Sequence, residues 1–385
     1  MSLDDLRSRI DSIDDQILAL LEQRAEVVAR VARAKGEAGL PAYDPERERA
    51  VLDRLAQRGA GRFPRESIAR VYREVMSACL SIQAPVTVAF LGPEGTFTHI
   101  AARELFGLAA RYTETSTIDG VFDAVRRETV AYGVVPIENS TEGSVTYAVD
   151  ALLEGGVFIR RELVLEVSQC LLSLASGLSA VARVYSHPQA LAQCRGWLAK
   201  NLSSAQLVQT SSTAVAAREA ATDPAGAAVG SSLAGEVFGL PVLRERIQDR
   251  AENATRFVLL SREEARRTGD DKTTLSFALR DEPGALRRAL EIFDAAGVNL
   301  TRIESRPSRH KAWEYVFLVD VAGHREDEPV ARAVAQLRAQ TETDDLHGSY
   351  PRFAAYDGGH TRDLGDGTAS TPLPPLTLPP KEKTR

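Results

Sequence analysis

The residues best suited to chemistry in the first part of the chain are seven polar side chains spaced along a helical pattern. They are Arg7, Arg24, Lys35, Asp44, Arg47, Glu48 and Gln83. Apolar residues recur every three or four positions from Leu3 to Val31, which predicts one long amphipathic helix. Arg24 and Lys35 lie on its apolar stripe, about three turns apart. Burying two cations costs free energy unless an anion meets them, so the pattern favours an anion site. The alternative is that both side chains extend to solvent.

The spacing of these residues resembles the all-helical chorismate mutase domain of bacterial bifunctional P-proteins over residues 1–84. The matching pattern is Leu6-Arg7, Ile10, Asp14, Leu20-Leu21, Arg24, Lys35, Asp44 and Arg47-Glu48-Arg49. The resemblance implies an intertwined helical dimer without cofactor or metal. It also implies roles: Arg7, Arg24 and Arg47 would hold the carboxylates of chorismate. Lys35 and Gln83 would face its ether oxygen, and Glu48 and Asp44 would engage the ring hydroxyl or orient the basic residues. Lys35, Gln83 and Glu48 are thus the expected catalytic residues. Cys79, where related domains have serine, is a further expected contact.

The length of the first helix bears on how one site is assembled. Lys35 follows Arg7 by 28 positions, so a straight helix would separate them by ~42 Å. A small dianion cannot touch both from one helix. We therefore expect Arg7 to serve a site on a second subunit.

The composition is that of an ordinary globular protein. The 385 residues are 26% charged and 44% hydrophobic, with a net charge of −6 and interspersed signs. Two to four domains are expected, with no nucleic-acid footprint. The cysteines, Cys79, Cys170 and Cys194, lie far apart, which argues against a zinc site or a disulfide framework. Without a signal segment or an apolar span, the sequence predicts a cytoplasmic protein that does not contact membranes.

Hydrophobic patterning divides the chain into four zones. Residues 1–84 are predicted to be helical, with a break at 36–45 and further helices at about 46–57 and 65–83. Residues 86–262 alternate β-rich and helical runs, as in an α/β domain. Clear strands are expected at 86–91, 132–136, 167–173, 181–185, 227–230 and 256–260. Residues 273–352 give the order βαββαβ of a ferredoxin-like α+β unit. From 357 to 385 the chain lacks apolar periodicity, which predicts a disordered tail.

Polar turns recur through the middle zone. GPEGTFTH begins at Gly92, PIEN at Pro136, YSHPQ at Tyr185, TSST at Thr210 and TRF at Thr255. Four of the five turns lie at strand-to-helix junctions, where backbone amides and hydroxyls suit a small dianion. Together they resemble the prephenate dehydratase domain over residues 86–262.

That second resemblance implies a two-lobed fold, like a periplasmic binding protein, with a cleft between the lobes. We expect the chain to cross between lobes near Leu163 and Leu240. Thr255 would be the catalytic proton donor; its alternative is a plain strand-start hydroxyl. The expected prephenate-binding residues are Thr96, Asn139, Ser140, Thr141, Ser186, Gln189, Ser212, Thr213, Arg256 and Phe257.

The last zone carries two motifs that resemble the ACT regulatory module. One is Gly284-Ala285-Leu286 at a helix start, and the other is Glu304-Ser305-Arg306 before Pro307. The resemblance implies a phenylalanine pocket between two subunits. Arg287 stands where the family commonly has valine.

Taken together, the three resemblances imply a bifunctional chorismate mutase–prephenate dehydratase of phenylalanine biosynthesis, inhibited by phenylalanine. Its expected partners are chorismate, prephenate, phenylalanine and further copies of itself, as a homodimer or larger homo-oligomer. Two alternatives are open: a dehydratase that prefers arogenate, and a non-catalytic sensor of amino acids or small anions on the same folds.

Overall fold

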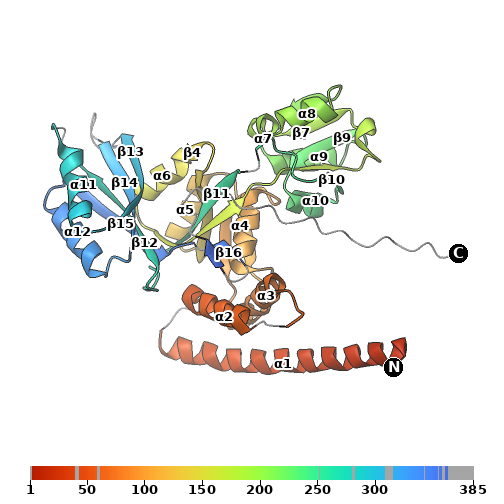
Figure 1. Ribbon diagram of the computed structural model, residues 1–385, viewed down its shortest axis with the longest axis horizontal. Helices are drawn as coiled ribbons and strands as arrows, with labels where there is room; N and C mark the ends of the chain where they lie inside the picture. Colours follow the sequence, from red (N-terminus) through yellow and green to blue (C-terminus); the bar gives the residue numbers. More distant parts are fainter. Residues whose placement is uncertain are drawn as a thin grey trace.

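The computed structural model describes residues 2–39, 43–58, 61–250, 252–279, 282–307, 315–341, 343–353, 355–357 and 360–362 (Figure 1). Most of the tail predicted to be disordered, 357–385, lies outside these ranges. Its described residues belong to a short antiparallel pair, β16 (Ala355–Asp357) with β17 (His360–Arg362).

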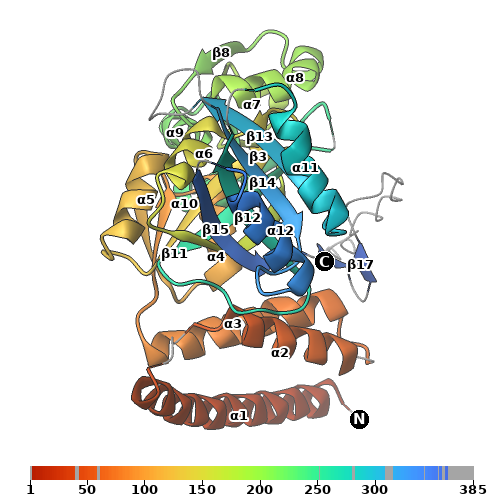
Figure 2. The ribbon, with the colours of Figure 1, turned by 90° about the vertical axis from the view of Figure 1, so that its left-hand side faces the viewer.

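Three helices form the N-terminal part: α1 (Leu3–Glu37), α2 (Pro45–Arg58) and α3 (Arg65–Gln83). The apolar periodicity predicted each of them. Ser2 begins α1 through a capping box with Asp5. In Figures 1 and 2, α1 is a rod on the outside of the molecule, and α2 and α3 lie between it and the rest.

The apolar stripe of α1 is not covered within this chain. None of the residues described for this helix is buried. Its exposed large apolar side chains are Leu3, Leu6, Ile10, Ile13, Ile17, Leu18, Leu20, Leu21, Val27 and Val31. Soluble proteins seldom leave so long a stripe in water, so α1 has the surface of a helix that packs against another molecule.

The first lobe of the middle part is a sheet in the order β2-β1-β3-β11-β5, with β4 paired to β3. Its strands are β1 (Thr87–Leu91), β2 (Arg111–Thr115), β3 (Tyr132–Asn139), β4 (Gly143–Ser144), β5 (Phe158–Glu166) and β11 (Ala254–Ser261). Its helices are α4 (Phe97–Phe106), α5 (Ile118–Arg126) and α6 (Thr146–Leu153). The sequence did not predict β2 or β5.

The second lobe is a smaller sheet in the order β10-β6-β9-β7-β8. Its strands are β6 (Cys170–Ser173), β7 (Arg183–Ser186), β8 (Gln206–Gln209), β9 (Gly226–Gly230) and β10 (Val242–Arg244). The short helix η1 (Leu178–Ala180) and helices α7 (Pro188–Gln193), α8 (Arg195–Asn201), α9 (Thr213–Ala220) and α10 (Ser232–Phe238) surround it.

The two crossings between lobes come later in the chain than predicted. Leu163 pairs with Phe257 inside the first sheet, because β5 continues to Glu166. The first crossing therefore spans 167–169, and only the end of the strand predicted at 167–173 is a strand. Leu240 lies in the core of the second lobe, before β10, and the return crossing spans 245–253.

The C-terminal part has the predicted ferredoxin-like arrangement. Strands β12 (Asp271–Ala278), β13 (Leu300–Pro307), β14 (Tyr315–Ala322) and β15 (Thr343–Pro351) form a sheet in the order β13-β14-β12-β15. Helices α11 (Ala285–Ala295) and α12 (Glu328–Arg338) pack on it through the core around Phe277 and Phe293. None of the helices within the described ranges is long and apolar enough to cross a membrane.

The sheet of the first lobe has a different neighbour on each face. Phe257 of β11 packs with Tyr43 of the N-terminal part and with α4. Val258, the next residue, packs in a cluster that includes Leu318 and Tyr350 of the C-terminal sheet. Successive side chains of a strand point to opposite faces. Strand β11 therefore lies between the N-terminal and C-terminal parts and contacts both.

Candidate active sites

A cavity of about 600 Å³ lies among the three N-terminal helices and the end of α4. Seven of the residues expected to bind chorismate line it: Arg24, Lys35, Asp44, Arg47, Glu48, Cys79 and Gln83. Arg7 is not among the lining residues; it is exposed near the start of α1 and bonds to Asp4 at 3.4 Å. A single chain thus brings together all of the expected set except Arg7.

Two polar atoms in this cavity lack the hydrogen bonds that burial demands. Arg24 Nη1 and Gln83 Oε1 are buried, and neither has a partner among the described residues. Leaving such atoms unsatisfied costs about 1–3 kcal/mol each. A ligand that carries both an anionic group and a hydrogen-bonding oxygen would remove that cost, provided that the amide of Gln83 turns its NH₂ end inward.

Glu48 is the buried carboxyl of the cavity. Burial raises its pKa above the ordinary value, while the guanidinium groups of Arg161 and Arg73 oppose that rise. Asp44 has a local task as well, because its carboxylate accepts a hydrogen bond from the backbone amide of Arg47 at 2.9 Å. This contact caps the start of α2 and so fixes the position of the first helical turn, which carries Arg47 and Glu48.

The wall opposite α1 comes from the middle part of the chain. Leu105 and Phe106 of α4 line the same cavity. Ser77 of α3 donates a hydrogen bond to the carbonyl of Phe106 at 2.5 Å and accepts one from the amide of Ala109 at 3.1 Å. Patterns inside residues 1–84 could not indicate these contacts, because they depend on docking of a separate domain.

Thr255 lies in a cluster of amide and hydroxyl groups at the start of β11. Asn139 Nδ2 donates to Thr255 Oγ1 at 2.8 Å and to Asn253 Oδ1 at 2.9 Å. The hydroxyl of Thr141 donates to the same oxygen of Asn253 at 3.3 Å. Asn253 is 4% exposed, and its Nδ2 has no partner among the described residues. Asn253 was not among the residues predicted to bind a ligand. Its buried, unpaired Nδ2 group makes it a candidate binding residue.

A second cavity, of about 560 Å³, begins at this cluster. Its lining residues are Thr141, Glu142, Gln189, Ala192, Gln193, Gln248, Asp249, Arg250 and Asn253. Gln189 of the second lobe donates a hydrogen bond to Glu142 of the first. On another side, Ser231 donates across the lobes to the carbonyl of Gly95 at 2.6 Å. Two hydrogen bonds therefore join the lobes.

Several of the residues expected to bind prephenate are occupied elsewhere. Thr96 and Ser212 cap the starts of α4 and α9 with their side chains. Ser186 is fully buried and donates to the carbonyl of Val229 at 2.6 Å. Thr213 is the first residue of α9, and Ser140 accepts from the amide of Ala254 at 3.0 Å. Of the expected set, Thr141 and Gln189 line the cavity and Asn139 bonds to its wall.

Arg256 and Phe257 do not reach this cavity. Phe257 is 2% exposed in the core between the sheet and α4. Arg256 points to the C-terminal sheet, where it donates to Asp320 at 2.6 Å and to the hydroxyl of Tyr350 at 2.9 Å. It also donates to Glu162 at 2.8 Å. Thr255 and Arg256 are adjacent on a strand, so their side chains point to opposite faces of the sheet. Arg256 therefore cannot join Thr255 on the same side.

The motifs expected to bind phenylalanine lie at one end of the C-terminal sheet. Ala278, just before α11, pairs with Val316, which in turn pairs with Arg306. Gly284, at φ 79°, precedes α11 and places Ala285 and Leu286 in its first turn.

Two of the three residues of the second motif contact the first lobe of the same chain. Glu304 accepts from Ser144 at 2.6 Å, and Arg306 donates to Asp150 at 3.1 Å. Ser305, between them, is exposed. A subunit interface here would therefore use the face that carries Ser305.

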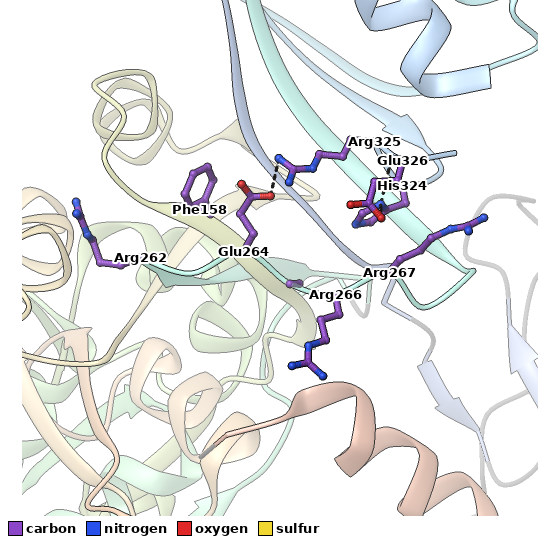
Figure 3. Close-up of a pocket in the computed structure, with 9 residues that line it drawn as sticks. Phe158, Arg262, Glu264, Arg266, Arg267, His324, Arg325 and Glu326 are labelled. Atoms are coloured by element: carbon purple, nitrogen blue, oxygen red, sulfur yellow. Dashed lines mark hydrogen bonds and ion pairs between the residues drawn. The ribbon is translucent and has the colours of Figure 1, made fainter. Parts of the chain in front are cut away.

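A third cavity, of about 500 Å³, lies at the joint between the middle and C-terminal parts (Figure 3). Its side chains do not converge: Arg262, Arg266 and Arg267 point in different directions. Arg325 is paired with Glu264 at 2.7 Å. We assign no ligand to it. None of the described residues forms a cluster of three or more metal-binding side chains.

Three family models match the chain in order. Chorismate mutase type II matches residues 6–84, prephenate dehydratase matches 88–265, and the ACT domain matches 273–339. A bifunctional chorismate mutase/prephenate dehydratase from Aquifex aeolicus is 46% identical over 354 residues, which cover 91% of this chain and 98% of that protein. The protein of the same name from Pseudomonas aeruginosa is 41% identical and covers 90% of this chain and 97% of its own length.

Among solved structures, a prephenate dehydratase from Arthrobacter aurescens in complex with L-Phe is similar to 69% of this chain. The match has a TM-score of 0.65 and 39% identity, and it covers 90% of that protein.

Proposed function

The chain belongs to the family of bifunctional chorismate mutase/prephenate dehydratases, and from this premise we propose which of its residues carry each reaction. The protein is an enzyme of phenylalanine biosynthesis that converts chorismate to prephenate and prephenate to phenylpyruvate. We place the first reaction in the cavity of the N-terminal helices and the second in the space between the two lobes.

The mutase reaction is a unimolecular rearrangement, so its catalysis consists of holding chorismate in a compact form and stabilising charge at the ether oxygen. Arg24 and Arg47 bind the carboxylates, Lys35 and Gln83 face the ether oxygen, and Glu48 accepts from the ring hydroxyl. Asp44 orients Arg47, and Cys79 contacts the substrate. The buried, unpaired atoms of Arg24 and Gln83 are the observation that supports this set most directly.

A second copy of the chain completes the mutase site. Two observations support this proposal: α1 buries none of its described residues, and Arg7 lies outside the cavity. A homodimer that covers the apolar stripe of α1 would bring the partner's Arg7 to the carboxylate of chorismate. We also place the protein in the cytoplasm, with which its three free cysteines are compatible.

The dehydratase reaction expels hydroxide while carbon dioxide leaves, and a donor to the departing oxygen lowers its barrier. We assign that donor to Thr255. Its oxygen accepts from Asn139, and no acceptor for its own hydrogen is found among the residues that the structure describes. The hydroxyl can therefore point its hydrogen at the substrate. Thr141, Gln189 and Asn253 bind prephenate beside it.

For the remaining predicted binders, the proposal depends on movement of the lobes. Closure of the lobes around prephenate would bring Ser140, Ser212 and Thr213 to its carboxylates. Thr96 and Ser186, whose hydroxyls donate to backbone carbonyls, would first have to give up those bonds. For Arg256 and Phe257, whose side chains point elsewhere, we propose a supporting role in place of direct binding.

Phenylalanine is proposed as the inhibitor that binds the C-terminal sheet. The related dehydratase from Arthrobacter aurescens was solved with L-Phe. Here the first turn of α11 offers backbone amides for a carboxylate. Gly284, Ala285 and Leu286 share an end of the sheet with Glu304, Ser305 and Arg306. We propose that phenylalanine binds there between two subunits.

One experiment tests these proposals together. Full-length protein is incubated with chorismate, with prephenate or with arogenate, and products are followed with and without phenylalanine. We expect prephenate and phenylpyruvate from chorismate, and less phenylpyruvate when phenylalanine is present. Faster turnover of arogenate than of prephenate would reassign the substrate. Binding of the ligands without any turnover would show a sensor built on the same folds.

A further inference from the structure

One charged side chain of the dehydratase domain contacts a carboxyl that lines the mutase cavity. Arg161 lies on β5, and its side chain points to the face of the sheet that the N-terminal helices cover. Its Nη1 lies 3.2 Å from the hydroxyl of Tyr43 and 4.0 Å from Glu48 Oε1. Figure 2 shows α2 and α3 lying directly beneath the dehydratase domain. Arg161 therefore belongs to one domain and contacts the proposed substrate-binding carboxyl of another.

Tyr43 fixes the guanidinium in this place. Its ring is 3% exposed and packs against the rings of Phe106 and Tyr132, with ring centres 4.9 Å and 5.4 Å away. Arg161 donates to the Tyr43 hydroxyl, so the cation is anchored beside Glu48 by a side chain that cannot move freely. A buried anchor of this kind limits the rotamers of a long side chain.

The carboxyl of Glu48 needs a nearby cation to stay ionised, because it is buried away from water. The charged groups around the cavity are Arg24 and Lys35 on α1, Asp44 just before α2, Arg47 and Arg54 on α2, Arg73 on α3, and Arg161 on β5. The titratable groups Tyr43, Tyr72 and Cys79 line it too. Burial raises the pKa of Glu48, and the largest opposing influence is Arg161, followed by Arg73. Arg73 is itself bonded to Glu104 at 2.6 Å, so part of its charge is already paired outside the cavity.

We propose that Arg161 is a positioning residue of the mutase reaction: from the dehydratase domain, it keeps the Glu48 carboxylate ionised and oriented to accept the ring hydroxyl of chorismate. This inference rests on the role proposed above for Glu48. The mutase site is then built from two domains of one chain together with a second copy. The chorismate mutase model matches only residues 6–84, so nothing in that domain alone assigns the role.

The test compares pH profiles of mutase kcat/KM in the full-length protein. In Arg161→Gln the cation is lost, so the pKa of Glu48 rises and the ionised form is lost at higher pH. We expect the acid limb to move up by about one pH unit, with about a tenfold loss on that limb. Arg161→Lys should restore most of the profile, and Tyr43→Phe should shift it in the same direction by less. Dehydratase turnover of added prephenate should stay as in the wild type.

A matched control separates this effect from loosening of the interface. Glu104→Gln breaks the Arg73 ion pair at the same interface without touching Glu48, and it should not move the acid limb upward. An unchanged acid limb in Arg161→Gln, or equal upward shifts in Arg161→Gln and Glu104→Gln, would overturn the proposal. Glu48→Gln separates the role proposed for Glu48 from the role proposed for Arg161. If Glu48→Gln keeps wild-type mutase activity, the proposed role of Glu48 fails; if it is impaired and Arg161→Gln is normal, only this inference fails.

Discussion

At the scale of single residues, we propose that the dehydratase reaction depends on the hydroxyl of Thr255, which accepts a hydrogen bond from Asn139 and can still donate one. We expect Thr255→Ala to lower dehydratase kcat by ~10²- to 10⁴-fold, the usual cost of losing a positioned proton donor. The mutase should be unaffected, so prephenate should accumulate from chorismate. Ultraviolet absorbance and chromatography follow both products. Thr129→Ala, a threonine remote from the cleft, is the control. Phenylpyruvate formed by Thr255→Ala at the wild-type rate would make Thr255 structural.

Gln83 offers a second prediction at this scale. An amide can donate to the ether oxygen at any pH, whereas a glutamate must first be protonated. Gln83→Glu should therefore shift the mutase optimum to acid pH, since the donating form exists only below the pKa of the new carboxyl. Mutase rates from pH 4 to 8 measure this, with dehydratase rates as the internal control. A mutase profile identical to the wild type would remove Gln83 from the catalytic set.

The pH dependence of folding stability involves a buried histidine, His347. The ring is 1% exposed and bonds to the hydroxyl of Ser276 at 2.8 Å. Burial lowers its pKa from 6.5 to about 4. The unfolded chain therefore binds a proton between pH 6.5 and 4 that the folded chain refuses, and stability is lost as pH falls through that window. The shift corresponds to about 3 kcal/mol.

His347→Gln should flatten this dependence. Thermal or urea unfolding at pH 7, 5.5 and 4.5 would show a smaller loss than in the wild type. Ser276→Ala is the matched control, because it removes the same hydrogen bond without removing the titrating ring, so it should lower stability while keeping the pH dependence. An equally steep acid loss in His347→Gln would rule out the histidine as its source.

At the scale of elements, β15 lies so close to β5 that only glycine fits at position 348. Gly348 has φ 138°, and a Cβ there would lie 3.0 Å from the backbone nitrogen of Ile159 and closer still to its carbonyl oxygen. We expect Gly348→Ala to push the ACT sheet from the dehydratase sheet and to cost about 1–3 kcal/mol or more. Urea unfolding gives the loss of stability. Inhibition by phenylalanine should weaken in parallel.

Gly269→Ala is the control for that substitution. Gly269 also has a positive φ, 94°, but a Cβ there meets nothing within 4 Å. It therefore carries the backbone strain without the clash. Similar losses in the two variants would mean that strain alone, and not close docking, sets the requirement for glycine.

The elements also show what the sequence could and could not predict. Helix α3 was predicted with its correct bounds, because its periodicity is clear and prolines flank it at 64 and 85. Strand β5 was missed because its charged residues Arg161 and Glu162 both lie against other domains; Glu162 is buried and Arg161 is partly buried. That burial hides the alternation by which a strand is usually recognised. The misplaced lobe crossing near Leu163 follows from the same omission.

The candidate sites divide in the same way. The side chains of the mutase cavity from Arg24 to Gln83 were predictable, because a resemblance fixed their types and spacing within one domain. Leu105, Phe106 and Arg161 were not, since docking of another domain brings them there. In the dehydratase domain, the role of Thr255 stays a prediction from the resemblance. The direction of Arg256 toward Asp320 could not be predicted, because it depends on strand alternation at a contact between domains.

At the scale of the whole molecule, the exposed stripe of α1 predicts that active mutase sites need two chains. Arg7→Ala and Arg24→Ala chains should each lack mutase activity. Mixed and allowed to exchange, they should regenerate up to one intact site per mixed dimer, because the partner's Arg7 and the chain's own Arg24 then meet. Mutase rates before and after exchange measure this. Mixed dimers, verified by two affinity tags, that recover no activity would contradict the shared site.

The alternation of β5 also has a consequence for misfolded forms of the chain. Arg161 faces Glu48 on one side of the sheet, and Glu162 faces Arg256 and Lys272 on the other. A slip of this strand by one residue against β11 would exchange the two faces. A slip in one direction would place Glu162 against Glu48, and a slip in the other direction would place Arg161 against Arg256 and Lys272. The charges that join three domains in the native protein therefore disfavour a one-residue misalignment of β5. The native contacts alone do not reveal this role, because it concerns an alignment that the chain does not adopt.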